Sequence, residues 1–272
     1  MHSFENKWAI ITGASSGIGK EFAQQLASQK CNLILVARRE QRLQEIQQEL
    51  QVKFNVQVEY IVADLSEVNS YQSIYDQAVQ HKNIHLLINN AGVGHYGPTM
   101  DHQLSDHMNT INVNISAVMS LTYLFTEHMQ AHKEKSYICN VASVAAFQGV
   151  PYFGVYCGTK KFVRDFTESL EFEFKGSNIS YSCLCPGGTY TEFLEHSKQD
   201  LKEAGHANMM SAKEVVEIGI KGILQEKGTV VTGFKNLIAS QLNRFIPGGW
   251  ARWIGHQAMH RSVNYRHEKG VL

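Results

Sequence analysis

The sequence predicts an α/β protein, a single domain built on a doubly wound parallel sheet of about seven strands with helices on both faces. A chain of 272 residues with 43% hydrophobic residues is long enough to bury one core of this kind. Short apolar runs alternate with longer amphipathic runs along it, and most of the short runs are too continuously apolar to leave one face in water. A glycine-rich turn joins the first apolar run to the first amphipathic run, as at the start of a βαβ unit.

The strands and helices can be assigned in order from these two patterns. The expected strands are residues 8–11, 32–37, 58–63, 85–89, 137–142, 179–185 and 229–232. Residues 19–29, 39–51 and 211–226 carry apolar side chains at helical spacing and are expected to be helices. In such a sheet, ligands bind beyond the carboxyl ends of the strands.

Charge and cysteine usage exclude several classes of protein. Because 25 Lys and Arg balance 25 Asp and Glu, we expect no nucleic-acid partner. The N-terminal residues resemble no signal peptide, and no apolar run is long enough to span a bilayer, so we expect a cytoplasmic protein. The chain has five cysteines, at positions 31, 139, 157, 183 and 185, mostly in apolar runs and without partners at zinc-ligand spacing. They are expected to be reduced core thiols, with no metal site.

The glycine-rich turn, "TGASSGIG" at residues 12–19, predicts a nucleotide site. Gly13 allows a tight turn, Gly17 lets the backbone approach a pyrophosphate, and Gly19 lets the helix pack closely on the strand. Nicotinamide enzymes usually place an acid after the second strand to bind the adenosine ribose, but here Ala37 is followed by Arg38 and Arg39. Two arginines suit a 2′-phosphate and predict NADP(H), unless they merely begin a solvated helix.

A tyrosine and a lysine stand four residues apart in "YCGTK", which places Tyr156 and Lys160 one turn apart on a helix. A phenol ordinarily has a pKa of about 10, and a fixed positive charge nearby moves that pKa toward neutrality. The pair is therefore a candidate acid–base unit, although such pairs are also common on helix surfaces.

Taken together, these motifs resemble the short-chain dehydrogenase/reductase family and its Rossmann-like fold. The resemblance covers about the first 235 residues and rests on motifs in family order: "TGASSGIG", Asp64-Leu65, "NNAG" at 89–92, Asn114, Ser143, "YCGTK" and "PGGTYT" at 186–191. The loop "PGGTYTEF" is most similar to the bacterial-type reductases of the family.

The resemblance implies a catalytic set of Asn114, Ser143, Tyr156 and Lys160. Tyr156 would be the general acid or base, Ser143 would stabilise charge on the substrate oxygen, and Lys160 would lower the tyrosine's pKa and hold the nicotinamide ribose. Asn114 would position a water beside Lys160, with Asn112 as the alternative. Asn89 is expected to tie strand ends together.

The cofactor site implied by the resemblance comes from four parts of the chain besides Tyr156 and Lys160. Its expected residues are Gly13, Ser15, Ser16 and Ile18 at the phosphates; Arg38, Arg39, Asp64 and Leu65 at the adenosine; Asn90, Ala91 and Gly92 along the ribose; and Pro186, Gly187, Thr189 and Thr191 over the nicotinamide. Either threonine could meet the carboxamide.

The predicted function is an NADP(H)-dependent oxidoreductase of the carbonyl reductase or alcohol dehydrogenase type, and family members suggest a homodimer or homotetramer. A catalytically inactive NADP(H)-binding regulatory or scaffold protein is the alternative. The expected substrate wall is apolar and suits a lipid-like or ring-containing carbonyl or alcohol, although the same side chains could pack a lid. It comprises Tyr96, Phe147, Tyr152, Phe153, Phe193, Met209 and Met210.

The chain divides into a catalytic domain, residues 1–235, and a basic amphipathic extension, residues 236–272. From residue 235 onward, six basic residues face the single acid Glu268. Two apolar stripes, 238–246 and 250–258, flank a Pro-Gly-Gly break. The extension could pack on the same domain or on a neighbouring subunit, or residues 236–260 could contact the inner face of a membrane peripherally.

Overall fold

A computed structural model describes residues 3–80, 82–197, 200–206, 209–242, 249–250, 253, 255–257 and 263–264. Most of the predicted C-terminal extension lies outside the described residues. This includes the basic residues at 244, 252, 261, 266 and 269, and the stripe members Phe245, Ile246, Ile254 and Ala258.

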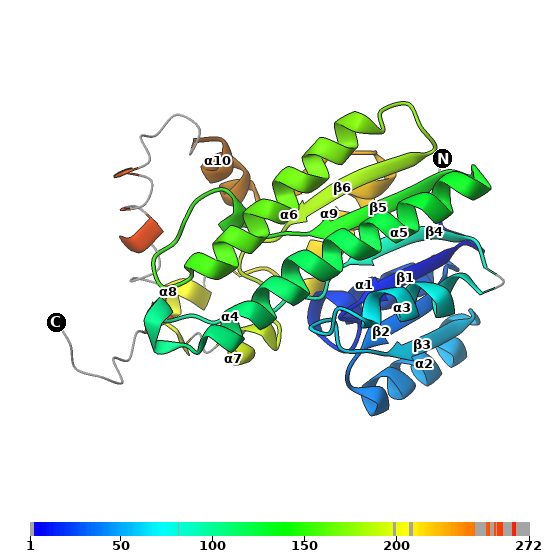
Figure 1. The fold of residues 1–272 in the computed structure, drawn as a ribbon, viewed down its shortest axis with the longest axis horizontal. Coiled ribbons are helices and arrows are strands. Elements are labelled where there is room, and N and C mark those ends of the chain that lie inside the picture. The colour runs from blue at the N-terminus through cyan, green and yellow to red at the C-terminus, as the bar shows by residue number, and fades with distance from the viewer. Residues whose placement is uncertain are drawn as a thin grey trace.

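The centre of the molecule is a seven-stranded, all-parallel sheet, as the sequence predicts, with the strand order β3-β2-β1-β4-β5-β6-β8 (Figure 1). Its strands are β1 (Trp8–Thr12), β2 (Asn32–Ala37), β3 (Val58–Val62), β4 (Ile84–Asn89), β5 (Ser136–Val141), β6 (Ile179–Cys185) and β8 (Thr229–Val231). The order reverses direction between β1 and β4, and a ligand crevice is expected at the carboxyl ends there.

The described helices cover both faces of the sheet, and α1, α2 and α9 lie close to the three helices that the sequence predicts. They are α1 (Gly17–Ser28), α2 (Glu40–Phe54), α3 (Ser70–Val79), α4 (Leu104–Ile111), α5 (Ala117–His132), α6 (Gly154–Glu173), α7 (Phe193–His196), α8 (Glu203–His206), α9 (Ala212–Leu224) and α10 (Phe234–Leu242), with short 3-10 turns η1 (Thr99–Asp101) and η3 (Val144–Ala146). A π-helical turn, η2 (Asn112–Ser116), joins α4 to α5. The sequence analysis did not foresee this turn.

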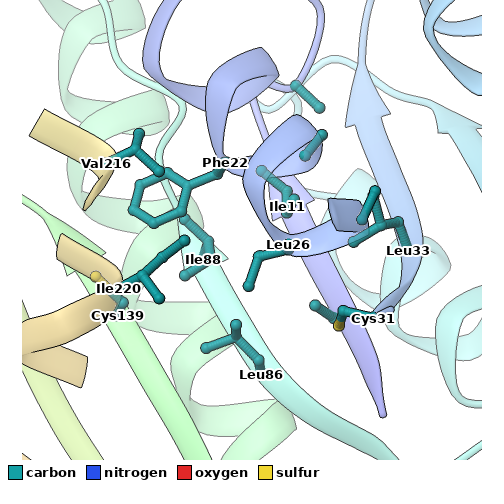
Figure 2. Close-up of a cluster of buried hydrophobic side chains, with 14 of the residues drawn as sticks. Ile11, Phe22, Leu26, Cys31, Leu33, Leu86, Ile88, Cys139, Val216 and Ile220 are labelled. Atoms are coloured by element: carbon teal, nitrogen blue, oxygen red, sulfur yellow. The ribbon is translucent and has the colours of Figure 1, made fainter. Parts of the chain in front are cut away.

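The continuously apolar strands are explained by two separate cores. In β1, Ile10 and Ile11 are both fully buried but belong to opposite faces, because successive side chains of a strand alternate. On one face, Phe22 of α1 and Val216 and Ile220 of α9 pack over the sheet (Figure 2). On the other face, side chains of α3 and α5, such as Ile74 and Phe125, form the second core.

All five cysteines are buried and free, which confirms the prediction of reduced core thiols. Burial raises the pKa of Cys139 to about 12, so this thiol remains protonated near neutral pH.

A short strand near the end of the chain takes part in a small second sheet that the sequence did not predict. β7 (Asp200–Leu201) pairs with β9 (Val263–Asn264) in antiparallel register. Gly255 is buried with Gln148 as a near neighbour, and the His256 ring lies 6.0 Å from the Tyr152 ring, so these residues contact the segment before α6. Among the described helices, none combines the length and the apolar character that crossing a bilayer requires.

Candidate active site

The glycine-rich turn lies between β1 and α1 at the carboxyl edge of the sheet. Gly13 and Gly17 have φ of +65° and +54°, a backbone conformation that residues other than glycine rarely adopt. At Gly19 the backbone is closely packed, because an added Cβ would collide with the Gly13 carbonyl oxygen and the side-chain amide of Asn90. The turn is therefore shaped to leave its backbone accessible to a ligand.

Thr12, the last residue of β1, fixes this turn to the neighbouring "NNAG" segment. Its hydroxyl accepts hydrogen bonds from the Asn90 and Ala91 amides at 3.0 and 3.1 Å, and the Asn90 side chain donates to the Thr12 carbonyl at 2.9 Å. The sequence analysis assigned Thr12 no role. Asn89 donates to Asn140 of β5 at 2.9 Å, which confirms that it ties strand ends together.

Tyr156 and Lys160 lie one turn apart near the start of α6, and both are buried. The Tyr156 ring stacks on Phe153 with a centroid distance of 4.3 Å, and the Phe193 ring lies 5.4 Å away. Ser143 precedes η3, where its Oγ accepts from the Ala145 amide at 3.1 Å and also hydrogen-bonds the Tyr156 side chain. These contacts hold the phenol in one position beside a serine hydroxyl.

The sequence predicts that Lys160 lowers the pKa of Tyr156. This prediction is wrong for the chain without a bound cofactor. Burial raises the pKa of Tyr156 above its ordinary value, and the Ser143 hydrogen bond lowers it only in part. The Lys160 ammonium lies 5.8 Å from the ring centroid and donates to the Val141 carbonyl at 2.8 Å. Burial also lowers the pKa of Lys160 to about 8. Desolvation therefore shifts both groups toward their neutral forms, but Lys160 remains mostly charged at neutral pH.

Asn114 lies beside Lys160, and Asn112 does not. Asn114 is fully buried in the π-helical turn, accepts from the Val93 amide at 2.9 Å, and donates to Val93 O at 2.9 Å and Thr159 Oγ1 at 3.0 Å. A Cβ added at Gly92 would be 3.2 Å from Lys160 Nζ and 3.5 Å from Asn114 Oδ1, so these groups share one small space. Asn112 instead donates to the Ser66 carbonyl at 3.1 Å.

The two arginines after β2 make different contacts. Arg39 donates to Ser15 Oγ at 3.0 Å, to Ser16 Oγ at 2.9 Å and to a Glu192 carboxylate oxygen at 2.8 Å. Arg38 forms a longer ion pair of 3.5 Å with Asp64. Burial acts to raise the pKa of Asp64, but hydrogen bonds from Ser66 and the charge of Arg38 outweigh it, and the net shift is downward.

The loop after β6 crosses the glycine-rich turn. Val144 N donates to the Pro186 carbonyl at 2.9 Å, and Thr189 Oγ1 donates to the Gly187 carbonyl at 3.0 Å. The Thr191 side chain packs on Gly17, where an added Cβ would lie 2.9 Å from Thr191 Cγ2. Thr191 therefore faces the glycine-rich turn, while Thr189 is folded back on its own loop.

One cavity of about 560 Å³ joins these segments. Every expected cofactor residue lines it, as do Ser143, Tyr156 and Lys160, whereas Asn114 lies behind the wall. The residues fit a nicotinamide dinucleotide, since the glycine-rich turn lines the cavity without a side chain at Gly13 or Gly17, and Arg39 supplies a cation at one end.

The apolar wall at the tyrosine end is only partly the expected one. Phe153 and Phe193 line the cavity together with Val150, Ala145 and Leu194. Tyr96 and Tyr152 pack against Phe153 and its neighbours in the same aromatic cluster. Phe147 lies under the Arg164 guanidinium and Met210 packs against the main core, so neither is part of this wall.

One histidine group at the opposite edge of the sheet has metal-ligand composition. His85, His132 and Glu134 lie within ligand distance of one another. However, the Lys7 ammonium is 2.6 Å from Glu134 and 3.3 Å from His85, and the His132 ring contacts the Ile84 carbonyl and the Glu134 amide. A cation already neutralises this group, and the absence of a metal stays a prediction.

The fold and the site together define a nucleotide-binding α/β protein of the Rossmann-like class. A family model for the short chain dehydrogenases matches residues 7–232. The chain belongs to the short-chain dehydrogenase family of oxidoreductases.

Vertebrate proteins are among the similar relatives. The very-long-chain 3-oxoacyl-CoA reductase of Rattus norvegicus is 29% identical over 253 residues, which is 91% of this chain and 77% of that protein. A very-long-chain 3-oxoacyl-CoA reductase-B of Danio rerio is 33% identical over 72% of this chain and 63% of its own length. An inactive hydroxysteroid dehydrogenase-like protein 1 of Homo sapiens is 30% identical over 66% of this chain and 55% of its own.

Solved structures share the fold over nearly the whole chain. A short-chain dehydrogenase/reductase from Burkholderia phymatum, in complex with NAD, has a TM-score of 0.81 at 26% identity and covers 89% of this chain and 94% of its own. An alcohol dehydrogenase from Thermococcus sibiricus, complexed with 5-hydroxy-NADP, has a TM-score of 0.73 at 25% identity, with 84% and 96% covered. These neighbours support a nicotinamide cofactor and leave open which one.

Proposed function

We propose that the chain is an NADP(H)-dependent oxidoreductase that transfers hydride between the nicotinamide and a carbonyl or secondary alcohol. The observation that carries this proposal is that Ser143, Tyr156 and Lys160 line the same cavity as the glycine-rich turn. The match of "PGGTYTEF" to bacterial-type reductases remains part of the proposal.

Tyr156 acts as the general acid when a carbonyl is reduced and as the base in the reverse direction. In the chain by itself the raised pKa keeps the phenol protonated. General acid catalysis is most efficient when the pKa lies near the working pH, so a positive charge near the phenol, such as that of Lys160, should make it a better acid. Ser143, already hydrogen-bonded to the tyrosine, stabilises the charge that develops on the substrate oxygen. Lys160 holds the nicotinamide ribose, and Asn114 positions a water beside it. When bound, the cofactor supplies or accepts the hydride.

The preference for NADP(H) rests on Arg38 and Arg39. Both line the cavity, and Ala37 stands where an acid would otherwise bind the ribose hydroxyls. Arginine binds phosphate with more than one hydrogen bond, which makes it the usual partner of a 2′-phosphate.

The substrate is proposed to be apolar and bulky. The cavity wall next to Tyr156 is formed by Phe153, Phe193, Val150 and Ala145. The names of the relatives point to 3-oxoacyl thioesters and hydroxysteroids, two classes in which the reacting carbon carries a large apolar group.

The extension from residue 236 is proposed to be an interaction surface, with a homodimer or homotetramer as the assembly. In its two apolar stripes, the described members Ile238, Leu242, Trp250 and Trp253 are all exposed. Exposure of tryptophans beside a basic sequence suits peripheral contact with an anionic membrane from the cytoplasmic side. Sedimentation with anionic vesicles, at low and high salt, tests that contact.

NADPH absorbance tests the proposed function. The purified chain is mixed with NADPH and a panel that includes a long-chain 3-oxoacyl-CoA, a ketosteroid and simple ketones. Oxidation of NADPH with at least one bulky apolar carbonyl supports the proposal. Tight NADPH binding with no turnover across the panel would favour the inactive scaffold protein instead.

A further inference from the structure

Arg39 is the centre of a cluster formed by three separate segments of the chain. Its guanidinium donates to Ser15 and Ser16 of the glycine-rich turn, and on another side to Glu192 of the loop after β6. Ser16 also hydrogen-bonds the Glu192 carboxylate. A cation and a hydroxyl therefore converge on one anionic group, which the protein itself supplies.

The chemistry of this cluster is that of a phosphate subsite. Arginine and serine side chains bind a carboxylate and a phosphate monoester with the same donors. Hydrogen bonding and the charge of Arg39 keep the pKa of Glu192 below its usual value, so the carboxylate is ionised at neutral pH. A 2′-phosphate that uses Arg39 must share it with this carboxylate or displace it.

The Glu192 contact also reaches the tyrosine end of the cavity. Glu192 directly precedes α7, whose first residue, Phe193, has its ring 5.4 Å from the Tyr156 ring. The Arg39–Glu192 bond thus fastens the segment that carries Phe193 to the glycine-rich turn, across the cavity that both residues line.

We propose that Glu192 is an internal occupant of the 2′-phosphate subsite, which competes with the phosphate of NADP(H) for Arg39 and so lowers the discrimination between NADP(H) and NAD(H). The inference rests on the proposed function, because it takes Arg39 to be the phosphate ligand. When the phosphate replaces the carboxylate, the segment bearing Phe193 is released from the glycine-rich turn, which couples cofactor binding to the substrate wall.

Two small probes isolate the contribution of the phosphate. Isothermal titration of the full chain with 2′,5′-ADP and with 5′-AMP is carried out for the wild type, Glu192→Gln and Glu195→Gln. Glu195 is an exposed acid on the same short helix and controls for the change in net charge. We expect Glu192→Gln to bind 2′,5′-ADP about two- to fivefold more tightly, the size of a partly exposed ion pair, with 5′-AMP unchanged. Glu195→Gln should match the wild type for both probes.

A double mutant identifies the partner. In an Arg39→Ala background, Glu192→Gln should no longer tighten 2′,5′-ADP, because the contested group is gone. An unchanged or weaker affinity of Glu192→Gln for 2′,5′-ADP, or an equal gain for 5′-AMP, would overturn the role of Glu192. If the wild type and Glu192→Gln both bind the two probes equally, the NADP(H) assignment itself is wrong.

Discussion

The two ends of the cavity differ in how deeply their polar and charged side chains are buried and in which groups they pair with. At the tyrosine end, Lys160 is only 3% exposed and Asn114 is fully buried, and each is hydrogen-bonded to a backbone carbonyl of a neighbouring segment. At the arginine end, the Arg38 and Arg39 side chains are 65% and 41% exposed and pair with acids. Because a buried charge is costly unless its partners are fixed, the first end has little freedom to exchange contacts.

This difference predicts that proton transfer takes place at the buried end and that the choice of cofactor is made at the exposed end. Groups locked by burial keep one geometry, which suits proton transfer. Exposed ion pairs contribute little to stability and are easily exchanged, which suits a site that must trade an internal carboxylate for a cofactor phosphate. Substitutions at the two ends should therefore differ in both size and kind.

The largest effect is expected from Tyr156→Phe. This change removes the transferable proton but keeps the ring that stacks on Phe153. Turnover should fall by about 10²- to 10⁴-fold, the usual contribution of a positioned acid, while the affinity for NADPH stays close to that of the wild type. Steady-state rates and a fluorescence titration with NADPH measure the two quantities. A variant that retains a tenth of the activity would rule out the acid role.

A second, smaller effect concerns Lys160 and pH. Its pKa of about 8 in the folded chain lies below the value of about 10.4 for an unfolded lysine. Between these values the unfolded state binds more protons, so the free energy of unfolding should rise with pH over this range. Relative to Lys160→Met, the wild type should gain at most about 3 kcal/mol.

Urea denaturation of both proteins without cofactor, from about pH 7 to about pH 10, measures this difference. The methionine variant is the matched control, since it keeps a long apolar side chain but has no titrating group. Parallel stability curves for the two proteins would show that Lys160 keeps an ordinary pKa.

The third effect, at the exposed end, should appear in binding and not in stability. Arg39→Ala removes charge-assisted hydrogen bonds to a phosphate and should weaken NADPH binding about tenfold, with NADH affected far less. Titrations with both cofactors test this. Equal losses for NADH and NADPH would show that Arg39 does not select the phosphate.

The same contrast explains what the sequence could and could not predict. Most strands were recognisable because burial on both faces makes the run apolar, as at Ile10 and Ile11. Tyr156, Lys160 and the glycine-rich turn were recognisable because their spacing is local.

What could not be predicted depends on distant contacts or on burial. Glu192 meets Arg39 across 153 residues of chain, and no local pattern encodes such a pair. The direction of the Tyr156 pKa shift depends on desolvation, which only the packed aromatic cluster determines. The π-helical turn that carries Asn114 spans only Asn112–Ser116, which is too short for a periodic pattern in the sequence to mark it.

The smallest effect is expected from Arg38→Gln, which removes the weaker of the two arginine ion pairs at the exposed end of the cavity. The Arg38–Asp64 pair is long, at 3.5 Å, and mostly exposed, so losing it should change the free energy of unfolding by less than about 1 kcal/mol.

Arg38 nevertheless lines the cavity, and its charge should still attract a 2′-phosphate through water. NADPH binding should therefore weaken only about two- to fivefold at low salt, and the difference from the wild type should shrink as salt screens the charge. A loss as large as that of Arg39→Ala and insensitive to salt would mean that Arg38 binds the phosphate directly, which would make both arginines part of one fixed site.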